Sequence, residues 1–178
     1  MKEYSIGDEK TMYPGGGSGG YSLSEGIVFG QYKIIRALGR GGMGEVYEAE
    51  HTTLGKRYAL KLLPADFAMR HGAVERFRRE AKVMANLEHE NILRVDDFGN
   101  TDGRYWLRME LAEGWEGNIT LEDYAKSCGG KIPQKEMAEI LKHILLGLDY
   151  AHSKGVVHRD LKPSNIVFVR DRGGVDPF

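Results

Sequence analysis

The sequence predicts an α+β fold, in which a five-stranded antiparallel sheet with one helix precedes a mainly helical part. Two observations predict it. Short runs rich in β-branched and aromatic residues, separated by turn residues, fill most of the chain before residue 114. After that point, apolar residues recur at helical spacing over longer stretches.

The predicted strands are joined by recognisable turns. The first two flank a glycine cluster and therefore form a hairpin, and the last two surround the turn at 100–103. The third strand ends at Pro64, which lacks the N–H group that a strand ladder needs. The predicted strands are 32–39, 44–51, 56–64, 91–99 and 104–114.

One helix, at 72–89, is predicted between the third and fourth strands. Its apolar residues recur at helical spacing, so they lie on one face that can cover one side of the sheet. The residues of this face are Phe77, Ala81, Met84 and Leu87.

Two further helices are predicted, at 119–129 and 133–155. In the longer one, Pro133 and Glu136 mark the start and Gly155 marks the end. Its main apolar stripe is Met137, Leu141, Ile144, Leu145 and Leu148.

This long helix is apolar around much of its circumference, because Ile140 and Leu146 lie off the main stripe. Such a helix needs neighbours on several sides, and the chain offers few. We therefore expect an exposed apolar surface on the helical part and self-association through it.

Composition narrows the class of protein. The 178 residues suit one domain or two small lobes, and 25 Lys+Arg against 26 Asp+Glu argues against a nucleic-acid binder. The single cysteine, Cys128, excludes an internal disulfide and favours a cytoplasmic protein. No run approaches the about 20 apolar residues of a membrane helix, and the N-terminus has no signal-peptide core.

Residues 1–26 are polar and rich in glycine, so we expect a flexible leader, because its few apolar side chains cannot offset the entropy lost on ordering. Ser18, Ser22 and Ser24 are candidate phosphorylation acceptors in this leader. A solvated tail is the interpretation that we favour.

The first hairpin carries the sequence Gly-Arg-Gly-Gly-Met-Gly from Gly39 to Gly44. Glycines allow a backbone to approach a ligand closely, so that its amides can point at phosphate oxygens. A tight turn would need the same residues. Since a strand follows, the dinucleotide-binding fingerprint is excluded, and since no Lys-Ser or Lys-Thr pair closes the loop, it is not a Walker loop.

Lys61 lies among apolar residues of the third strand, on the same face as Ala59. Either it meets an anion there, or its ammonium reaches solvent at the strand edge. Glu80 lies on the inward face of the helix, where a carboxylate needs a cation. Lys61 is one candidate for that cation, whereas Arg78 or Arg79 could hold Glu80 at the surface.

The stretch from His158 to Asn165 is the most specific chemical signal. Its histidine and arginine can support a loop that presents Asp160 to a substrate hydroxyl. Lys162 adds a positive charge nearby, and Asn165 offers a neutral oxygen for a hard cation such as Mg2+. The alternative is a polar loop broken by Pro163.

Four stretches together resemble the motifs of eukaryotic-like protein kinases: "GRGGMGEVYEA", "YALK", "RFRREA" and "HRDLKPSN". The residues at these positions are most similar to those of bacterial serine/threonine kinases. The resemblance covers about 29–170. It implies a kinase-like fold with a leader at 1–26, an N-lobe and hinge at 27–112, and a partial, mainly helical C-lobe at 113–178.

The resemblance also implies an ATP site. Gly39, Gly41 and Gly44 would cover the phosphates, Val46 and Ala59 would lie above the adenine and Val167 below it, Met109 would be the gatekeeper, and the backbone of Glu110 to Ala112 would bond the adenine edge.

The catalytic roles follow from the same resemblance. Lys61, positioned by Glu80, would hold the α- and β-phosphates. Asp160 would accept the proton of a protein Ser/Thr hydroxyl, Lys162 would steady the γ-phosphate, and Asn165 would bind Mg2+.

The sequence also departs from the family pattern. "HEN" at 89–91 replaces His-Pro-Asn, and no Asp-Phe-Gly follows Asn165, since Asp176-Pro177-Phe178 does not match it. We therefore expect an ATP-dependent serine/threonine kinase whose truncated chain has little activity alone. The alternatives are a truncated pseudokinase that acts as a nucleotide-binding or regulatory module, and a small-molecule phosphotransferase of the same fold.

Overall fold

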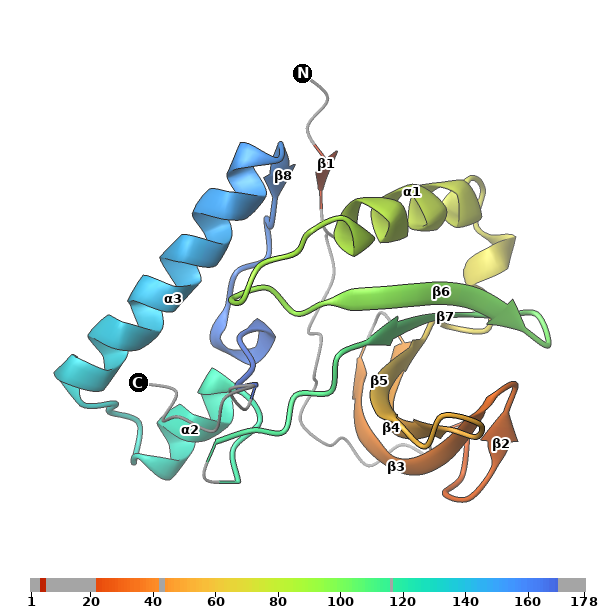
Figure 1. Cartoon of the computed structure of the whole chain (residues 1–178), viewed down its shortest axis with the longest axis horizontal. Helices are drawn as coiled ribbons and strands as arrows, with labels where there is room; N and C mark the ends of the chain where they lie inside the picture. Colours follow the sequence, from red (N-terminus) through yellow and green to blue (C-terminus); the bar gives the residue numbers. More distant parts are fainter. Residues whose placement is uncertain (1–3, 6–21, 42–43, 116, 170–178) are drawn as a thin grey trace. The chain divides into compact units, whose positions relative to one another are not determined.

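A computed structural model describes residues 4–5, 22–41, 44–115 and 117–169 (Figure 1). The chain forms two compact units. The first contains Glu9–Leu87 and Leu93–Leu111, and the second contains Met1–Asp8, Glu88–Ile92 and Ala112–Phe178. Asp176-Pro177-Phe178 and Ser18 lie outside the described residues.

The first unit contains a curled antiparallel sheet (Figure 1), in the order β2-β3-β4-β5-β7-β6. Its strands are β2 (Val28–Phe29), β3 (Tyr32–Gly41), β4 (Gly44–His51), β5 (Arg57–Leu62), β6 (Val95–Thr101) and β7 (Arg104–Met109). The five predicted strands are confirmed, although β6 begins at Val95 and β7 ends at Met109. The sixth strand, β2, was missed, because two residues carry no periodicity.

One face of the sheet holds the main apolar core of this unit. Alternation along β4 and β5 directs Tyr47, Ala49, Leu60 and Leu62 to this face, where all four are fully buried. Tyr32 packs edge-on against Trp106, with ring centroids 5.4 Å apart. The core residues are Phe29, Tyr32, Ile34, Tyr47, Ala49, Leu60, Leu62 and Trp106.

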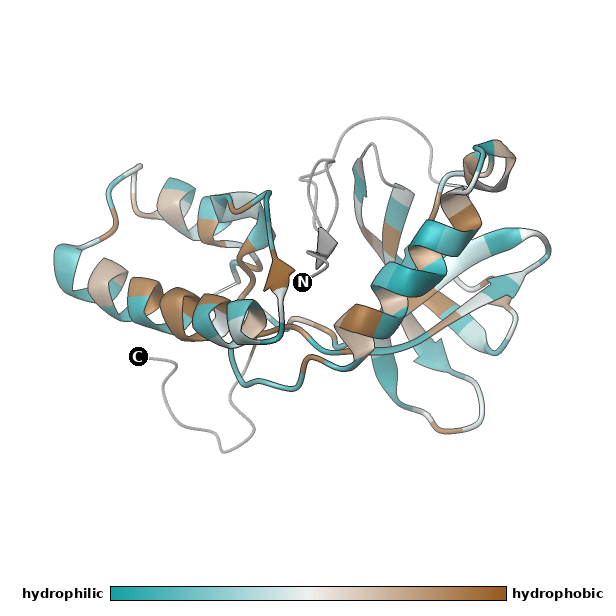
Figure 2. Ribbon diagram, turned by 90° about the horizontal axis from the view of Figure 1, so that it is seen from above, coloured by the Kyte–Doolittle hydropathy of each residue, from teal (hydrophilic) through white to brown (hydrophobic). Residues whose placement is uncertain are grey.

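The other face of the sheet contacts α1 (Ala73–Ala85). Phe77 lies edge-on to Phe98 of β6 and to Tyr105 of β7, with centroid distances of 6.1 and 6.0 Å. Figure 2 shows hydrophilic and hydrophobic residues alternating along this helix. The predicted inward face is confirmed for Phe77 and Ala81, which are buried. A short 3-10 turn, Phe67–Met69, precedes the helix.

The second unit is mainly helical, with α2 (Leu121–Ser127) and α3 (Gln134–Ser153). Short elements follow: β8 (Val156–Val157), which pairs in parallel with β1 (Tyr4–Ser5), and a 3-10 turn at Pro163–Asn165. The helix α2 begins with a capping box, in which the Thr120 side chain accepts from the Asp123 N–H and Asp123 binds the Thr120 N–H in return. Leu121, Tyr124 and Ile140 form the buried core of this unit.

The predicted stripe of α3 is only partly right. Met137 and Ile144 pack against the core, but Leu141 and Leu145 are 48% and 62% exposed, while Ile140 is buried. The reason lies at Gly147, where a Cβ atom would come within 2.8 Å of the Asn91 carbonyl oxygen. The loop containing Asn91 thus packs on the glycine side of the helix, which rotates the buried face away from Leu141 and Leu145.

That loop is the one with the unusual His-Glu-Asn sequence. The Asn91 side-chain nitrogen lies 2.9 Å from Nδ1 of His143 on α3, and the ring of His89 packs on Tyr150 at 5.0 Å. Within the described residues, α3 and the other helices lack the length or apolar content to cross a bilayer.

Candidate active site

The three predicted glycines lie on the hairpin of β3 and β4, near its turn. Gly39 pairs with Val46, and Gly41 pairs with Gly44. At Gly44, φ is 116° and a Cβ atom would lie 1.9 Å from the Leu62 carbonyl oxygen, so only glycine fits there. The residues at the tip, 42–43, lie outside the described part.

The strand register places four predicted site residues on one face of the sheet. Val46 lies opposite Lys61, and Ala59 lies opposite Met109. Because Ala59 and Lys61 are two positions apart on one strand, all four side chains share this face. Val46, Ala59 and Met109 are almost fully buried. The face therefore combines an apolar surface with one lysine.

The same face is the one that α1 covers, which brings Glu80 into electrostatic range of Lys61. Burial lowers the pKa of Lys61 to about 8, and the charge of Glu80 opposes this effect. Burial raises the pKa of Glu80, while Arg76 and Lys61 lower it. The second cation beside Glu80 is therefore Arg76, one helical turn earlier, and neither of the two arginines suggested by the sequence.

The residues predicted to bond the adenine edge follow Met109. The Glu110 N–H donates to the Arg94 carbonyl at 2.9 Å, so Glu110 would contact a base by accepting a hydrogen bond at its own carbonyl oxygen. Ala112, which belongs to the second unit, is 3% exposed. Val167 of the same unit bridges to Thr120, and the adjacent Phe168 N–H donates to the Ile119 carbonyl at 2.9 Å.

In the second unit, the loop after β8 brings three predicted residues together. Lys162 Nζ donates to Asp160 Oδ2 at 2.7 Å, and Asn165 Nδ2 donates to the same oxygen at 3.0 Å and to the Asp160 carbonyl at 2.8 Å. The hydrogen bond from Lys162 lowers the pKa of Asp160, and the one from Asn165 adds to this effect. Asp160 is therefore a carboxylate at neutral pH.

The backbone of this loop is bent sharply at Arg159. Its φ is 58°, in the left-handed region, and the Asp160 N–H donates to the His158 carbonyl at 2.8 Å. Non-glycine residues in this region carry strain that is often found at functional sites. The bend presents Asp160 between Lys162 and Asn165.

His158 lies at the base of the loop. Burial lowers its pKa, although the charge of Asp160 acts in the opposite direction. Among the described residues, its Nδ1 atom is buried without a hydrogen-bond partner. The sequence predicted a supporting role for this histidine, and nothing in the described part of the chain completes its bonding.

For Mg2+, the described residues offer few ligands. Because Asn165 directs Nδ2 at Asp160, its amide oxygen is the atom with ligand chemistry for a hard cation. The described part of the chain has no group of three or more His, Cys, Asp or Glu side chains that could hold a metal ion. The residues therefore fit an ion that takes most of its oxygens from phosphates and water.

The family model for the protein kinase domain matches residues 32–175. The chain belongs to the protein kinase family. The kinase chain is 42% identical over 146 residues to the serine/threonine-protein kinase PknH of Mycobacterium bovis. The matched region covers 82% of this chain and 24% of that protein. It is 39% identical over 140 residues to PrkC of Bacillus subtilis, covering 79% of this chain and 21% of that protein.

Solved structures agree with this assignment. The kinase domain of Mycobacterium tuberculosis PknI matches the kinase chain with a TM-score of 0.70 and 35% identity, covering 83% of this chain and 59% of that one. The kinase chain thus spans about a quarter of the curated relatives' length and just over half of the solved domain. The predicted kinship with bacterial serine/threonine kinases and the kinase-like α+β fold are confirmed.

Proposed function

We propose that this chain supplies the nucleotide-binding residues and the catalytic loop of a serine/threonine protein kinase, which transfers the γ-phosphoryl group of ATP to a protein hydroxyl. The observation that carries the proposal is the lysine beside a carboxylate on an apolar sheet face: Lys61 near Glu80, next to Val46 and Ala59. An apolar face suits a base, and a lysine suits phosphates.

In this proposal the nucleotide meets the first unit through Lys61 and the glycine hairpin. With a pKa of about 8, Lys61 is mostly charged at pH 7, and anionic phosphates would stabilise that charge further. The backbone at Gly39, Gly41 and Gly44 would lie over the phosphates, because no side chain separates it from them.

The catalytic loop would orient the acceptor. Asp160, ionised through its bonds to Lys162 and Asn165, would accept a hydrogen bond from the Ser/Thr hydroxyl and take its proton as the phosphoryl group arrives. Lys162 would face the γ-phosphate. A bound Mg2+ would neutralise charge on the phosphates, and Asn165 is the residue that would contact it.

The 178-residue polypeptide contains no Asp-Phe-Gly after Asn165. We infer that the chain alone binds nucleotide and transfers phosphate poorly, because phosphoryl transfer depends on fixed charge from fully held metal ions. In that form it has the properties of a binding module.

Nucleotide binding is tested by the thermal unfolding of the full chain with and without Mg-ATP. A ligand that binds only the folded state raises the midpoint, so we expect a shift in the parent chain and in Lys56→Met, an exposed control. We expect little shift in Lys61→Met. Equal shifts in both variants would refute the role of Lys61.

Catalysis is tested separately, with a generic Ser/Thr peptide and labelled ATP. We expect transfer near background for the parent chain. Robust transfer that disappears in Asp160→Asn would contradict the inferred weak activity and would support the catalytic role of Asp160.

A further inference from the structure

The glycine hairpin is followed at once by a buried carboxylate. Glu45 succeeds Gly44 in β4 and is 6% exposed. Because Glu45 and Val46 are consecutive in a strand, the Glu45 side chain points to the other face of the sheet, away from the proposed nucleotide surface. A buried carboxylate is costly unless donors surround it, so its partners must be identified.

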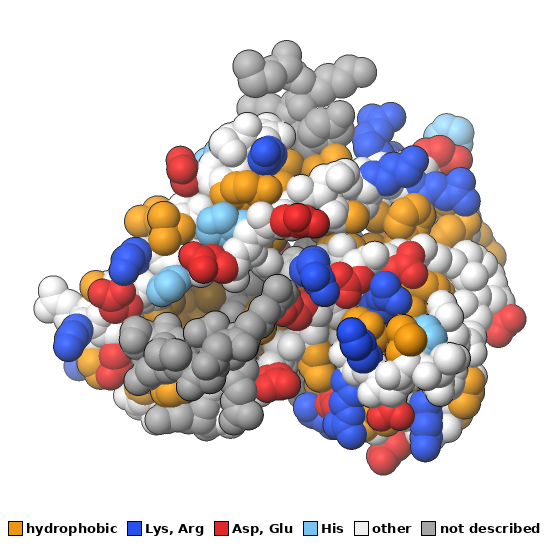
Figure 3. Space-filling model, in the orientation of Figure 1, with side chains coloured by type: hydrophobic (Ala, Val, Ile, Leu, Met, Phe, Trp, Pro, Cys, Tyr) orange, Lys and Arg blue, Asp and Glu red, His pale blue; other side chains and the backbone are white. Residues whose placement is uncertain are grey.

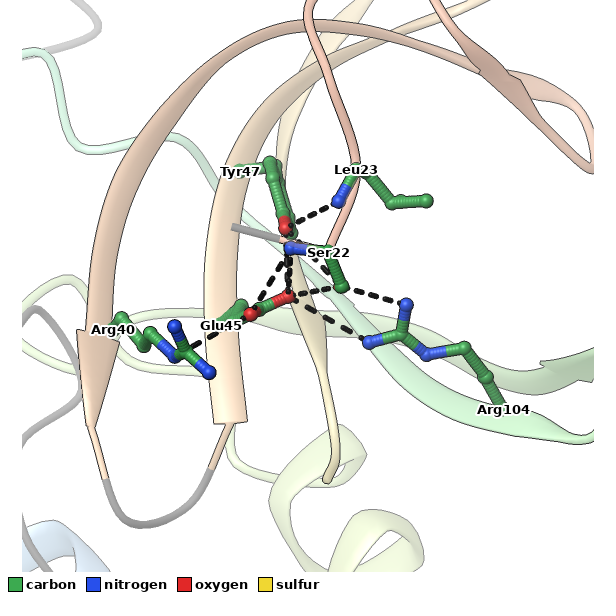
Figure 4. A network of polar contacts seen from close by, with 6 residues as sticks. All are labelled: Ser22, Leu23, Arg40, Glu45, Tyr47 and Arg104. Carbon is green, nitrogen blue, oxygen red and sulfur yellow. Dashed lines mark hydrogen bonds and ion pairs between the residues drawn. The ribbon is translucent and has the colours of Figure 1, made fainter. Parts of the chain in front are cut away.

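Two of the donors come from Ser22, far away in the sequence (Figure 4). The Ser22 hydroxyl donates to Glu45 Oε2, and the Ser22 N–H donates to Oε1 at 3.2 Å. Tyr47, two residues along β4, donates its hydroxyl to Oε2 at 2.7 Å and accepts the Leu23 N–H at 3.1 Å. Ser22 and Leu23 belong to the segment that the sequence predicted to be a flexible leader. In the structure, Ser22 bonds to the Glu45 carboxylate and Leu23 bonds to the Tyr47 hydroxyl, so both contact the sheet.

Two arginines complete the cluster. Arg40 Nε lies 3.5 Å from Glu45 Oε1, and Arg104 Nη2 lies 3.6 Å from Oε2. Arg104 Nη1 also donates to the Ser22 hydroxyl oxygen at 2.7 Å. Burial by itself would raise the pKa of Glu45, but the bonds from Ser22 and Tyr47 and the charge of Arg104 lower it overall. The carboxylate is thus charged, and both of its oxygens have partners.

The cluster joins the β3–β4 hairpin to β7 and to the segment before β2. Arg40 lies on β3 and pairs directly with Glu45 on β4, so their ion pair links both strands of the hairpin. Arg104 comes from β7, and Ser22 from the segment before β2. Glu45 therefore connects both strands of the hairpin to Ser22.

We propose that Ser22 is a positioning residue for the glycine hairpin, and that it prepares the hairpin for nucleotide through Glu45. The inference rests on the proposed nucleotide site. Ser22 makes no contact with the nucleotide; it restricts the motion of the strand from which the hairpin turns. A hairpin that is held before binding loses less entropy when the phosphates arrive.

The test uses the 178-residue chain with Ser22→Ala, the conservative Ser22→Thr, and Ser24→Ala as a matched control, because Ser24 is an exposed serine two residues along. Calorimetry with Mg-ATP should give a dissociation constant about three- to tenfold weaker for Ser22→Ala, as expected for partial loss of a bond to a charged group. Ser22→Thr should restore most of the affinity, and Ser24→Ala should match the parent.

Amide hydrogen exchange of the nucleotide-free chains separates positioning from general stability. In Ser22→Ala, the amides of 39–41 and 44–46 should exchange faster, while those of α3 should match the parent. Uniformly faster exchange, or a lowered unfolding midpoint with unchanged ATP affinity, would show that Ser22 stabilises the fold in general and does not position the hairpin.

The two proposals fail in different ways. If the parent chain binds no ATP, the proposed function fails, and exchange in the hairpin still decides the role of Ser22. If ATP binds but Ser22→Ala changes neither affinity nor hairpin exchange, the positioning role is overturned.

Discussion

Lys61 carries its charge at a cost to the folded state. Burial lowers its pKa from the ordinary value of 10.5 to about 8, so between these two values the unfolded chain binds a proton that the folded chain does not. The free energy of unfolding therefore rises with pH across this range. Below pH 8, Lys61 is charged in both states and the cost is present in full.

Replacing this lysine should stabilise the nucleotide-free protein. At pH 7 we expect Lys61→Met to raise the free energy of unfolding by at most about 3 kcal/mol, the equivalent of the lowered pKa. The gain should decline between pH 8 and 10.5. Urea unfolding at several pH values, with Lys56→Met as the exposed control, measures it. A less stable Lys61→Met at pH 7 would show that the lysine is better accommodated than its pKa indicates.

Some individual site residues were predictable from the sequence and others were not. Lys61, Glu80 and Asp160 could be named, because a charged residue in an apolar stripe or a dense polar loop stands out in a sequence. Arg76 and Ser22 could not. Their partners depend on how the helix and the segment before β2 lie against the sheet, and no local pattern encodes that.

Among the elements, the β3–β4 hairpin depends on one glycine more than on the others. Gly44 has a positive φ and no room for a Cβ atom, whereas Gly55, with φ of 64°, has no atom within 4 Å of that position. Both would be strained by alanine, but only Gly44 would also collide with the backbone.

We expect Gly44→Ala to lower the free energy of unfolding by about 3 kcal/mol or more, and Gly55→Ala by about 1 kcal/mol. Chemical denaturation of the two variants beside the parent chain measures both. If the two variants lose similar amounts of unfolding free energy, β4 can shift away from Leu62, and the close approach at Gly44 does not contribute to stability.

Helices and strands were largely predictable because their periodicity is local. The exception is the buried face of α3, where the predicted stripe is right at Met137 and Ile144 and wrong at Leu141 and Leu145. Helical spacing favoured these two leucines, but Gly147 allows the Asn91 loop to approach closely, and this contact shifts the buried face toward Ile140. A close approach between segments far apart in the sequence overrides an apolar pattern.

In the whole molecule, α3 carries three of the large apolar side chains that are exposed among the described residues. Leu141, Leu145 and Leu146 are 48%, 62% and 45% exposed. Figure 3 shows apolar side chains at the surface among charged ones in this part of the molecule. Exposed leucines favour association, because covering them releases the water that their apolar surface orders.

We propose that the 178-residue chain associates with itself through this surface. Light scattering should show a mass that grows with concentration for the parent chain and a monomer for Leu141→Gln/Leu145→Gln. Leu54→Gln is the control, because Leu54 is 61% exposed but lies in the turn after β4. A parent chain that stays monomeric at high concentration would refute this expectation.

The Ser22 contact bears on how such proteins are trimmed for laboratory work. The family match begins at residue 32, which makes that position an obvious start for a shortened recombinant fragment. Such a fragment would keep Glu45, Arg40 and Arg104 but discard the serine that bonds to Glu45 and Arg104. Its weaker nucleotide affinity would then reflect the choice of first residue, and screens for inhibitors run on it would measure an altered hairpin.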